Sequence, residues 1–264
     1  MKVVLFCGGL GLRIRESPES LPKPMIPIGY RPLLWHVMKY YAHFGHTDFI
    51  LCLGYRADVI KTYFMNYNEY LSNDFVLSNG GRNLNLLNRD INDWNITFVD
   101  TGTASNIGQR LKAVQPFLGD DEMFLANYSD GVSDLPLPEY IDHFRRRDKV
   151  AQFLAVRPLH TYHVASIRDG LVQSIAPICK SDTRINGGYF AFRREIFDYM
   201  QPGEELVEQP FQRLIERQLL LGYEYDGYWA CMDTFKDKDQ LEGLYNRGEA
   251  PWELWKANAG VPAC

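Results

Sequence analysis

Short apolar runs recur along the first part of the chain, and each is followed by a loop that contains Gly, Asp or Pro. Their β-branched and aromatic content is typical of buried strands. The pattern therefore predicts strands at Val3–Cys7, Phe49–Leu53, Ile96–Val99, Met123–Ala126 and Gln152–Val156.

Stretches with helical spacing lie between several of these strands, at Pro32–Phe44, Ala57–Tyr70 and Pro138–Arg147. Strand and helix thus alternate, which is the order expected of a largely parallel sheet with helices on both faces. Ligands of such sheets bind outside the carboxyl ends of the strands. The loops after the first, third and fourth predicted strands are therefore where functional residues are expected.

The pattern changes after Ala151, where shorter strands are predicted around a single helix. The strands are expected at Leu171–Ile175, Gly188–Phe192 and Glu224–Cys231, the helix near Glu208–Leu221, and a closing helical segment around Lys236–Asn246. No repeat, low-complexity tract or clear linker interrupts the sequence. A single domain over residues 1–264 is therefore expected.

The composition argues against several classes of protein. The 264 residues are 46% hydrophobic, enough for one large core. The formal net charge of -5 provides no general basic field, so a nucleic-acid partner is not expected. No apolar run approaches the length of a signal peptide or a membrane span, so we expect a cytoplasmic protein without a membrane partner. The cysteines are scattered and form no CxxC pair, which indicates neither a disulfide framework nor a zinc site.

The opening stretch LFCGGLGLRIRESPESLPKPM, residues 5–25, combines a glycine-rich strand exit with two cations, Arg13 and Lys23. It is no P-loop, because neither GKS nor GKT occurs, and the dinucleotide fingerprint is weak, because Ile14 stands where its third glycine belongs. A third interpretation is a loop whose glycines surround a nucleotide while the two cations bind its phosphates. Glycines that merely form a turn are the alternative.

Two acidic residues follow predicted strands elsewhere in the chain. Asp130 lies in NYSDGV, just beyond the fourth predicted strand, and Asp233 lies in WACMDT. Each alone is more often a turn residue than a ligand. Two carboxylates from distant loops, completed by phosphate oxygens and water, are the expected way to hold Mg²⁺. Their position relative to the glycine loop favours a magnesium site.

Several segments resemble the sugar-1-phosphate nucleotidylyltransferases, and the DTG segment and the closing stretch are similar to their glucose-1-phosphate cytidylyltransferase branch. The segments run in order over nearly the whole chain: GGLGLR at 8–13, LPKPM at 21–25, WNITFVDTG at 94–102, SDGV at 129–132, INGGYF at 185–190 and WACMDTFKDKDQLEGLYNRGEAPW at 229–252. The resemblance implies a Rossmann-like nucleotidyltransferase fold with a mixed, mostly parallel central sheet flanked by helices. It also implies nucleotidyl transfer from a nucleoside triphosphate, with CTP preferred, to a sugar 1-phosphate such as glucose 1-phosphate, with release of pyrophosphate.

The resemblance also implies roles for individual residues. Arg13 and Lys23 match the catalytic phosphate-binding pair, and Asp130 and Asp233 match the ligands of Mg²⁺. The nucleotide-binding set is Gly8, Gly9, Gly11, Leu12, Arg13, Lys23, Arg110 and Asp130, and the expected acceptor contacts are Tyr128, Lys180, Asn186 and Gly187. Residues 1–150 are then the nucleotide-binding part, 151–235 the acceptor-binding part and 236–264 a C-terminal helical segment. A homo-oligomer is expected, as in such relatives.

The match departs from the family pattern on both substrate sides. Leu12 replaces the threonine of the usual GGxGTR loop, and the Glu-Lys-Pro triplet that usually precedes the INGG turn is missing. Lys180 or Arg184 is the proposed substitute cation on the acceptor side. Loss of a carboxylate that binds substrate hydroxyls changes discrimination strongly. A different phosphorylated acceptor, or a non-catalytic regulatory homologue that binds nucleotide or sugar, therefore stays an alternative.

Overall fold

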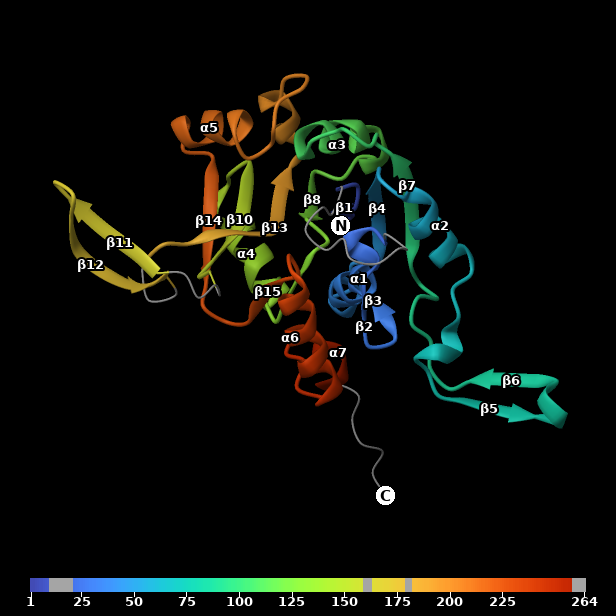
Figure 1. The fold of residues 1–264 in the computed structure, drawn as a ribbon. Helices are drawn as coiled ribbons and strands as arrows, with labels where there is room; N and C mark the ends of the chain where they lie inside the picture. Colours follow the sequence, from blue (N-terminus) through green and yellow to red (C-terminus); the bar gives the residue numbers. More distant parts are fainter. Residues whose placement is uncertain (10–20, 159–162, 179–181, 258–264) are drawn as a thin grey trace.

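A mixed sheet forms the centre of the protein in the computed structural model, which describes residues 1–9, 21–158, 163–178 and 182–257 (Figure 1). Within these ranges it has seven strands. In spatial order they are β14 (Leu220–Tyr225), β10 (Ala151–Val156), β13 (Ile185–Arg193), β8 (Met123–Asn127), β1 (Val3–Phe6), β4 (Asp48–Leu53) and β7 (Asn95–Asp100). Only β13 pairs antiparallel with its neighbours, β8 and β10. The predicted mixed, mostly parallel sheet is confirmed.

Successive side chains along a strand point to opposite faces of the sheet, so the core is divided into two clusters, one on each face. Val3 and Leu5 belong to one buried cluster, and Val4 and Phe6 belong to the other. The first cluster is covered by α1 (Leu33–His43), α2 (Ala57–Met65) and α4 (Leu137–Arg147), and the second by α3 (Ile107–Val114) and α5 (Gln209–Glu216). Strands buried on both faces are expected to read as continuous apolar runs, as these do.

The C-terminal part packs on α1. Helix α7 (Leu254–Ala257) contacts α1, and Tyr245 of helix α6 (Phe235–Asn246) packs its ring against His36 of α1. Trp252, between the two C-terminal helices, is buried in the first cluster. Short 3₁₀ helices occupy Lys23–Met25, Glu69–Leu71, Asn79–Gly81, Gln115–Leu118 and Arg194–Tyr199. No helix in the described ranges has both the length and the apolar character needed to cross a membrane.

Paired strands outside the central sheet form ribbons. β9 (Gly131–Ser133) pairs with β15 (Trp229–Cys231), and β2 (Pro27–Ile28) pairs with β3 (Arg31–Pro32). Two longer hairpins project from the body of the molecule in Figure 1, one made of β5 (Phe75–Ser78) and β6 (Asn83–Leu86), the other of β11 (His163–Arg168) and β12 (Leu171–Pro177).

Three boundary predictions were wrong. The helix expected at Ala57–Tyr70 ends at Met65, because Asn66 leaves the helical conformation, and a separate 3₁₀ helix follows at Glu69–Leu71. The helix expected at Glu208–Leu221 ends at Glu216, because Gln218 takes a left-handed conformation and the chain then enters β14 beside β10. The strand expected at Glu224–Cys231 is divided between β14 and β15, which belong to different sheets. A short apolar run fits a helix face and a strand equally well, and only the partner β10 decides between them.

Candidate functional site

Lys23 forms ion pairs with two carboxylates that lie far from it in the sequence. Its Nζ donates to Asp130 Oδ2 at 2.8 Å and to Asp233 Oδ1 at 2.5 Å. The Lys23 side chain is 15% exposed, whereas those of Asp130 and Asp233 are about one-third exposed. The structure therefore brings together one predicted catalytic cation and both predicted metal ligands, at a place that solvent can still reach.

The β9–β15 ribbon sets the two carboxylates side by side. Gly131 pairs with Cys231, and Met232 N donates to Asp130 O at 2.9 Å. Asp130 therefore precedes one strand of the ribbon, and Asp233 follows the other. Lys23 begins a 3₁₀ helix between two prolines, and the fixed φ of proline limits the conformations of this loop.

Charge and burial act against each other at this site. Burial acts to lower the pKa of Lys23, but Asp130 and Asp233 outweigh it and raise that pKa above its ordinary value. Burial also raises the pKa of Asp130, and Lys23 offsets this only in part. Lys23 is therefore a stable cation, and the site holds two acidic groups around one positive charge.

The donor set fits a hard divalent cation. Both carboxylates contact the same nitrogen, so both are directed at one charged group. Within the described ranges no three His, Cys, Asp or Glu side chains gather into a metal cluster. Mg²⁺ suits such a place, because one or two carboxylates with substrate phosphates and water complete its shell.

Asp237 fixes the backbone beside Asp233, and the sequence analysis missed it. Its Oδ2 accepts from Asp233 N at 3.0 Å and from Thr234 N at 2.8 Å, while Thr234 caps α6 in return. The T-x-x-D spacing of this capping arrangement was a usable signal. Cys231 Sγ lies 3.4 Å from Asp233 Oδ2, so neighbouring groups contact both oxygens of Asp233.

Ser129 precedes Asp130 and was also missed. It is fully buried, has a φ of +61° and donates its hydroxyl to Phe6 O at 2.7 Å. No sequence pattern predicts a left-handed backbone conformation at a serine, although an SDG segment is compatible with a sharp turn.

Arg110 joins the carboxyl ends of neighbouring strands next to the glycine loop. Its guanidinium donates to Gly8 O at 2.9 Å, Leu53 O at 3.1 Å and Thr101 Oγ1 at 2.7 Å. The side chain is buried, and burial lowers its pKa. Gly9 lies next to this contact and is exposed. The remaining predicted loop residues, Gly11, Leu12 and Arg13, lie outside the described residues.

The predicted acceptor residues that the structure describes also come together. Asn186 Nδ2 donates to Tyr128 Oη at 3.2 Å, and Gly187 O accepts from Trp229 Nε1 at 2.8 Å. The turn expected at Asn186 and Gly187 is wrong, because both residues lie in strand β13, which pairs with β10. Trp229 belongs to β15, so this part of β13 is joined to the strand that leads to Asp233. Lys180 lies outside the described residues.

Arg184, the other candidate cation on this side, is bound to acidic residues. It forms ion pairs with Glu224 at 3.1 Å and Asp226 at 3.1 Å, and it donates to Ala155 O at 3.3 Å. These contacts hold it against β10 and β14.

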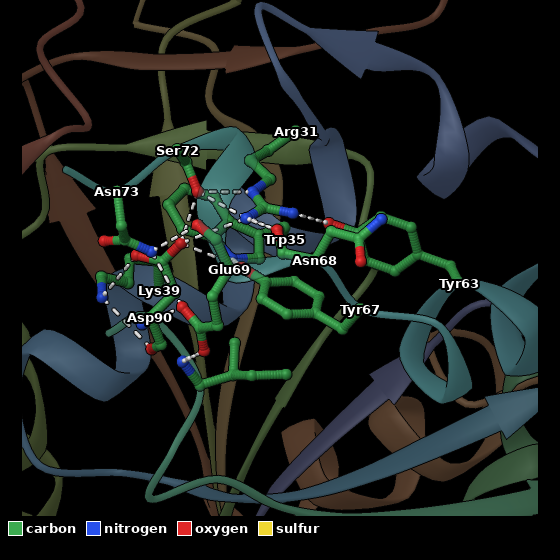
Figure 2. Close-up of polar contacts among 11 residues, drawn as sticks. Arg31, Trp35, Lys39, Tyr63, Tyr67, Asn68, Glu69, Ser72, Asn73 and Asp90 are labelled. Atoms are coloured by element: carbon green, nitrogen blue, oxygen red, sulfur yellow. Dashed lines mark hydrogen bonds and ion pairs between the residues drawn. The ribbon is translucent and has the colours of Figure 1, made fainter. Parts of the chain in front are cut away.

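A second charged cluster lies around Arg31 and Asp90, both buried (Figure 2). Arg31 Nε donates to Ser72 Oγ at 2.8 Å, and Ser72 Oγ and Tyr67 Oη donate to Asp90 Oδ2 at 2.5 and 3.0 Å. Arg31 and Lys39 also form ion pairs with Asp90 at 3.4 and 3.6 Å. The cluster joins α1 and β3 to the chain on either side of the β5–β6 hairpin, so it anchors that hairpin.

Comparison of sequences identifies relatives along the full length of the chain. It is 40% identical to a glucose-1-phosphate cytidylyltransferase from Salmonella typhimurium over 258 residues, which cover 97% of this chain and all of the relative. A probable glucose-1-phosphate cytidylyltransferase from Bacillus subtilis is 32% identical with the same coverage. No family model matches the chain.

Solved structures agree on the fold. A putative glucose-1-phosphate thymidylyltransferase from Bacillus anthracis superposes with a TM-score of 0.67 at 19% identity, covering 92% of this chain and 94% of that one. A UDP-glucose pyrophosphorylase superposes with a TM-score of 0.67 at 16% identity, covering 94% and 98%. The Rossmann-like arrangement expected from the sequence is thereby confirmed.

Proposed function

The chain belongs to the glucose-1-phosphate cytidylyltransferase family, and on that premise we propose that Lys23, Asp130 and Asp233 form the phosphate- and metal-handling part of its active site. The reaction joins a nucleoside triphosphate to a sugar 1-phosphate. The observation that carries the proposal is the convergence of both carboxylates on Lys23 Nζ, at 2.8 and 2.5 Å. This charged group lies at the edge of the sheet where ligands of such folds bind.

The chemistry explains why cations matter more than a general base. An acceptor phosphate oxygen attacks the α-phosphorus of CTP, the bond from that phosphorus to the bridging oxygen breaks, and pyrophosphate leaves with the electron pair. The nucleophile is already ionised at neutral pH, so no residue has to remove a proton. The protein instead has to bind and neutralise phosphates.

Asp130 and Asp233 are the residues that would hold Mg²⁺. When bound there, the ion would neutralise charge on the triphosphate and orient it. Lys23 lies between the same two carboxylates and keeps its charge because its pKa is raised. In the proposed complex it contributes its ammonium to the phosphates, and Arg13 contributes a second cation.

The nucleotide side of the proposal rests on the strand ends next to Arg110. The bond from Arg110 to Gly8 O fixes the start of the glycine loop. Gly8 and Gly9 would allow the backbone to approach the nucleotide, and Gly11 and Leu12 continue the proposed contact. On the acceptor side, the contact between Asn186 and Tyr128, with Gly187 beside it, supports a sugar-binding site at the start of β13. Lys180 is the proposed cation for the acceptor phosphate.

We further propose that residues 1–150 are the nucleotide-binding part and residues 151–235 the acceptor-binding part, followed by the C-terminal helical segment 236–264. We place the reaction in the cytoplasm.

We also propose a homo-oligomer. On the β5–β6 hairpin, Phe75 faces Leu86 and Leu77 faces Leu84 across the strands, and three of these four side chains are at least 40% exposed. An isolated two-stranded hairpin is marginally stable in water, so contact with a second copy would stabilise it.

The experiment is pyrophosphate release with Mg²⁺ and glucose 1-phosphate, measured in turn with CTP, UTP, dTTP, ATP and GTP. We expect turnover with CTP, and then preference for glucose 1-phosphate in a panel of sugar 1-phosphates. The Lys23→Ala variant is expected to lose activity, whereas Lys61→Ala, an exposed lysine on α2, is the matched control.

The outcomes separate the alternatives. Turnover with CTP but with another phosphorylated acceptor would indicate a changed acceptor side. Folded protein that binds CTP in calorimetry but turns over nothing would instead indicate a regulatory homologue. Wild-type rates from Lys23→Ala would contradict the assignment of the site.

A further inference from the structure

We propose that Ser129 is a positioning residue that sets the place of the Asp130 carboxylate. The inference rests on the proposed role of Asp130 as a metal ligand. Ser129 has a φ of +61°, in the left-handed region that residues other than glycine seldom adopt. Among the described residues other than glycine, Ser129 is the only one with a positive φ that is buried. The others with a positive φ are Arg56, Asn79, Asp148, Asp169 and Gln218.

Contacts with two central strands maintain this conformation. Ser129 N donates to Asn127 Oδ1 at 2.7 Å, and Ser129 Oγ donates to Phe6 O at 2.7 Å. Asn127 ends β8, and Phe6 ends β1, the strand that leads into the glycine loop. The Ser129 hydroxyl therefore connects the turn that carries Asp130 to the end of β1, two residues before Gly8.

Neighbouring backbone bonds show where the chain changes direction. Tyr128 N still donates to Gly188 O on β13, at 3.0 Å, whereas Ser129 binds β1 on the other side of β8. Met232 N then donates to Asp130 O, which attaches the next residue to the β9–β15 ribbon. An extended residue at position 129 would direct residue 130 elsewhere. Ser129 thus decides whether the Asp130 carboxylate meets Lys23 Nζ, at 2.8 Å here.

Strained backbone persists where the surrounding structure determines it, and it concentrates at functional sites. If Ser129 had only a structural role, a variant that lost its contacts would lose both stability and metal binding. If Ser129 is a positioning residue, metal binding can fall while stability is kept. Replacement by glycine removes the hydroxyl bond but also relieves the strain, so the fold can keep its stability while Asp130 loses its fixed place.

The test uses the non-hydrolysable analogue α,β-methylene-CTP. Its Kd is measured by calorimetry with Mg²⁺ and with EDTA, and the ratio gives the gain in affinity that Mg²⁺ provides. We expect Ser129→Gly to reduce this gain by about 10-fold, the scale seen when a residue that orients a metal ligand is lost, with little change in Tm. Ser129→Ala, which keeps the strain and loses the hydroxyl, makes the same comparison if the glycine variant does not fold.

Two further variants interpret the result. Gln218→Gly relieves a left-handed residue just before β14 and should leave the gain unchanged. Asp130→Asn should abolish it. If Asp130→Asn abolishes the gain and both Ser129 variants keep it at the wild-type value, the inference is wrong and the proposed function stands. A wild-type gain in Asp130→Asn would overturn the metal-ligand assignment, and the inference with it.

Discussion

The guanidinium of Arg110 occupies the space where residue 8 would carry a side chain. An ideal Cβ built on Gly8 overlaps the Arg110 guanidinium, whose Nη2 also donates to Gly8 O at 2.9 Å. The same guanidinium passes Gly54, where a Cβ would lie 2.9 Å from Nη1. Two glycines thus make room for one buried arginine at the ends of β1 and β4.

Gly8→Ala is therefore expected to destabilise the protein. The added methyl must displace a buried, hydrogen-bonded guanidinium, and overpacking of this kind costs about 1–3 kcal/mol. Chemical denaturation measures the change in the free energy of unfolding. Gly9→Ala is the control, because a Cβ there meets no atom within 4 Å among the described residues. Equal stability of the two variants would contradict the steric role assigned to Arg110.

Asp233→Asn should lower kcat/KM by at least about 100-fold, the scale of losing one preorganised electrostatic partner. The substitution keeps the shape of the side chain but removes the charge that contacts Lys23 at 2.5 Å. Steady-state kinetics with CTP and varied Mg²⁺ measure the effect. An exposed carboxylate on α6, Asp239, offers the matched Asp239→Asn control. Similar losses in both variants would argue against a specific role for Asp233.

Much of the central sheet could be predicted, because strands buried on both faces read as unbroken apolar runs. The prediction that Asp130 is a functional residue followed from its place just after β8, since the loops at the carboxyl ends of strands bind ligands in such sheets. Asp130 and Asp233 were expected to share a metal site, but the ion pair of Lys23 with Asp233, which lies 210 residues away, was not predicted, because no local pattern indicates it. The two carboxylates were found because they follow predicted strands, Lys23 because it follows the glycine-rich loop, and the resemblance then supplied their roles.

Other features depend on tertiary contacts that no local pattern records. The φ of Ser129 is set by Asn127 and Phe6, and the space at Gly8 is filled by a side chain from α3. The β5–β6 hairpin was missed because its strands are short and mix Asn with Leu, although the Asn79-Gly80 pair at its turn was a usable hairpin signal.

Asp90→Ala should be among the most destabilising single changes in the chain. Asp90 is the acidic centre of the cluster in Figure 2, and its removal leaves the buried Arg31 without its carboxylate. Breaking a buried ion pair from one side costs about 3–5 kcal/mol. Asp58→Ala, which breaks the exposed Arg56–Asp58 pair, is expected to cost about 1 kcal/mol or less. Comparable unfolding midpoints for both variants would contradict the anchoring role of the cluster.

His36 is held neutral in the interface between α1 and the C-terminal helices. It is 1% exposed, and Trp252 Nε1 lies 3.3 Å from its Nδ1. A tryptophan N–H can only donate, so Nδ1 accepts and Nε2 carries the proton, which it donates to Ile28 O at 3.0 Å. Burial lowers the pKa of His36 to about 4. A second proton would have to be placed on Nδ1, against the Trp252 N–H.

Titration of His36 should therefore lower the free energy of unfolding as the pH is lowered. Its pKa is about 4 in the folded protein and near 6.5 when unfolded, so below pH 6.5 the unfolded chain binds the extra proton. The contribution is fully present above pH 6.5 and is lost as the pH falls towards 4, by about 3 kcal/mol in all. Because other groups titrate in this range, the measurement is the difference in unfolding free energy between wild type and His36→Gln from pH 8 to pH 4. The glutamine variant lacks this titration, so its disadvantage should shrink steadily below pH 6.5, and a difference independent of pH would show that His36 is not held neutral.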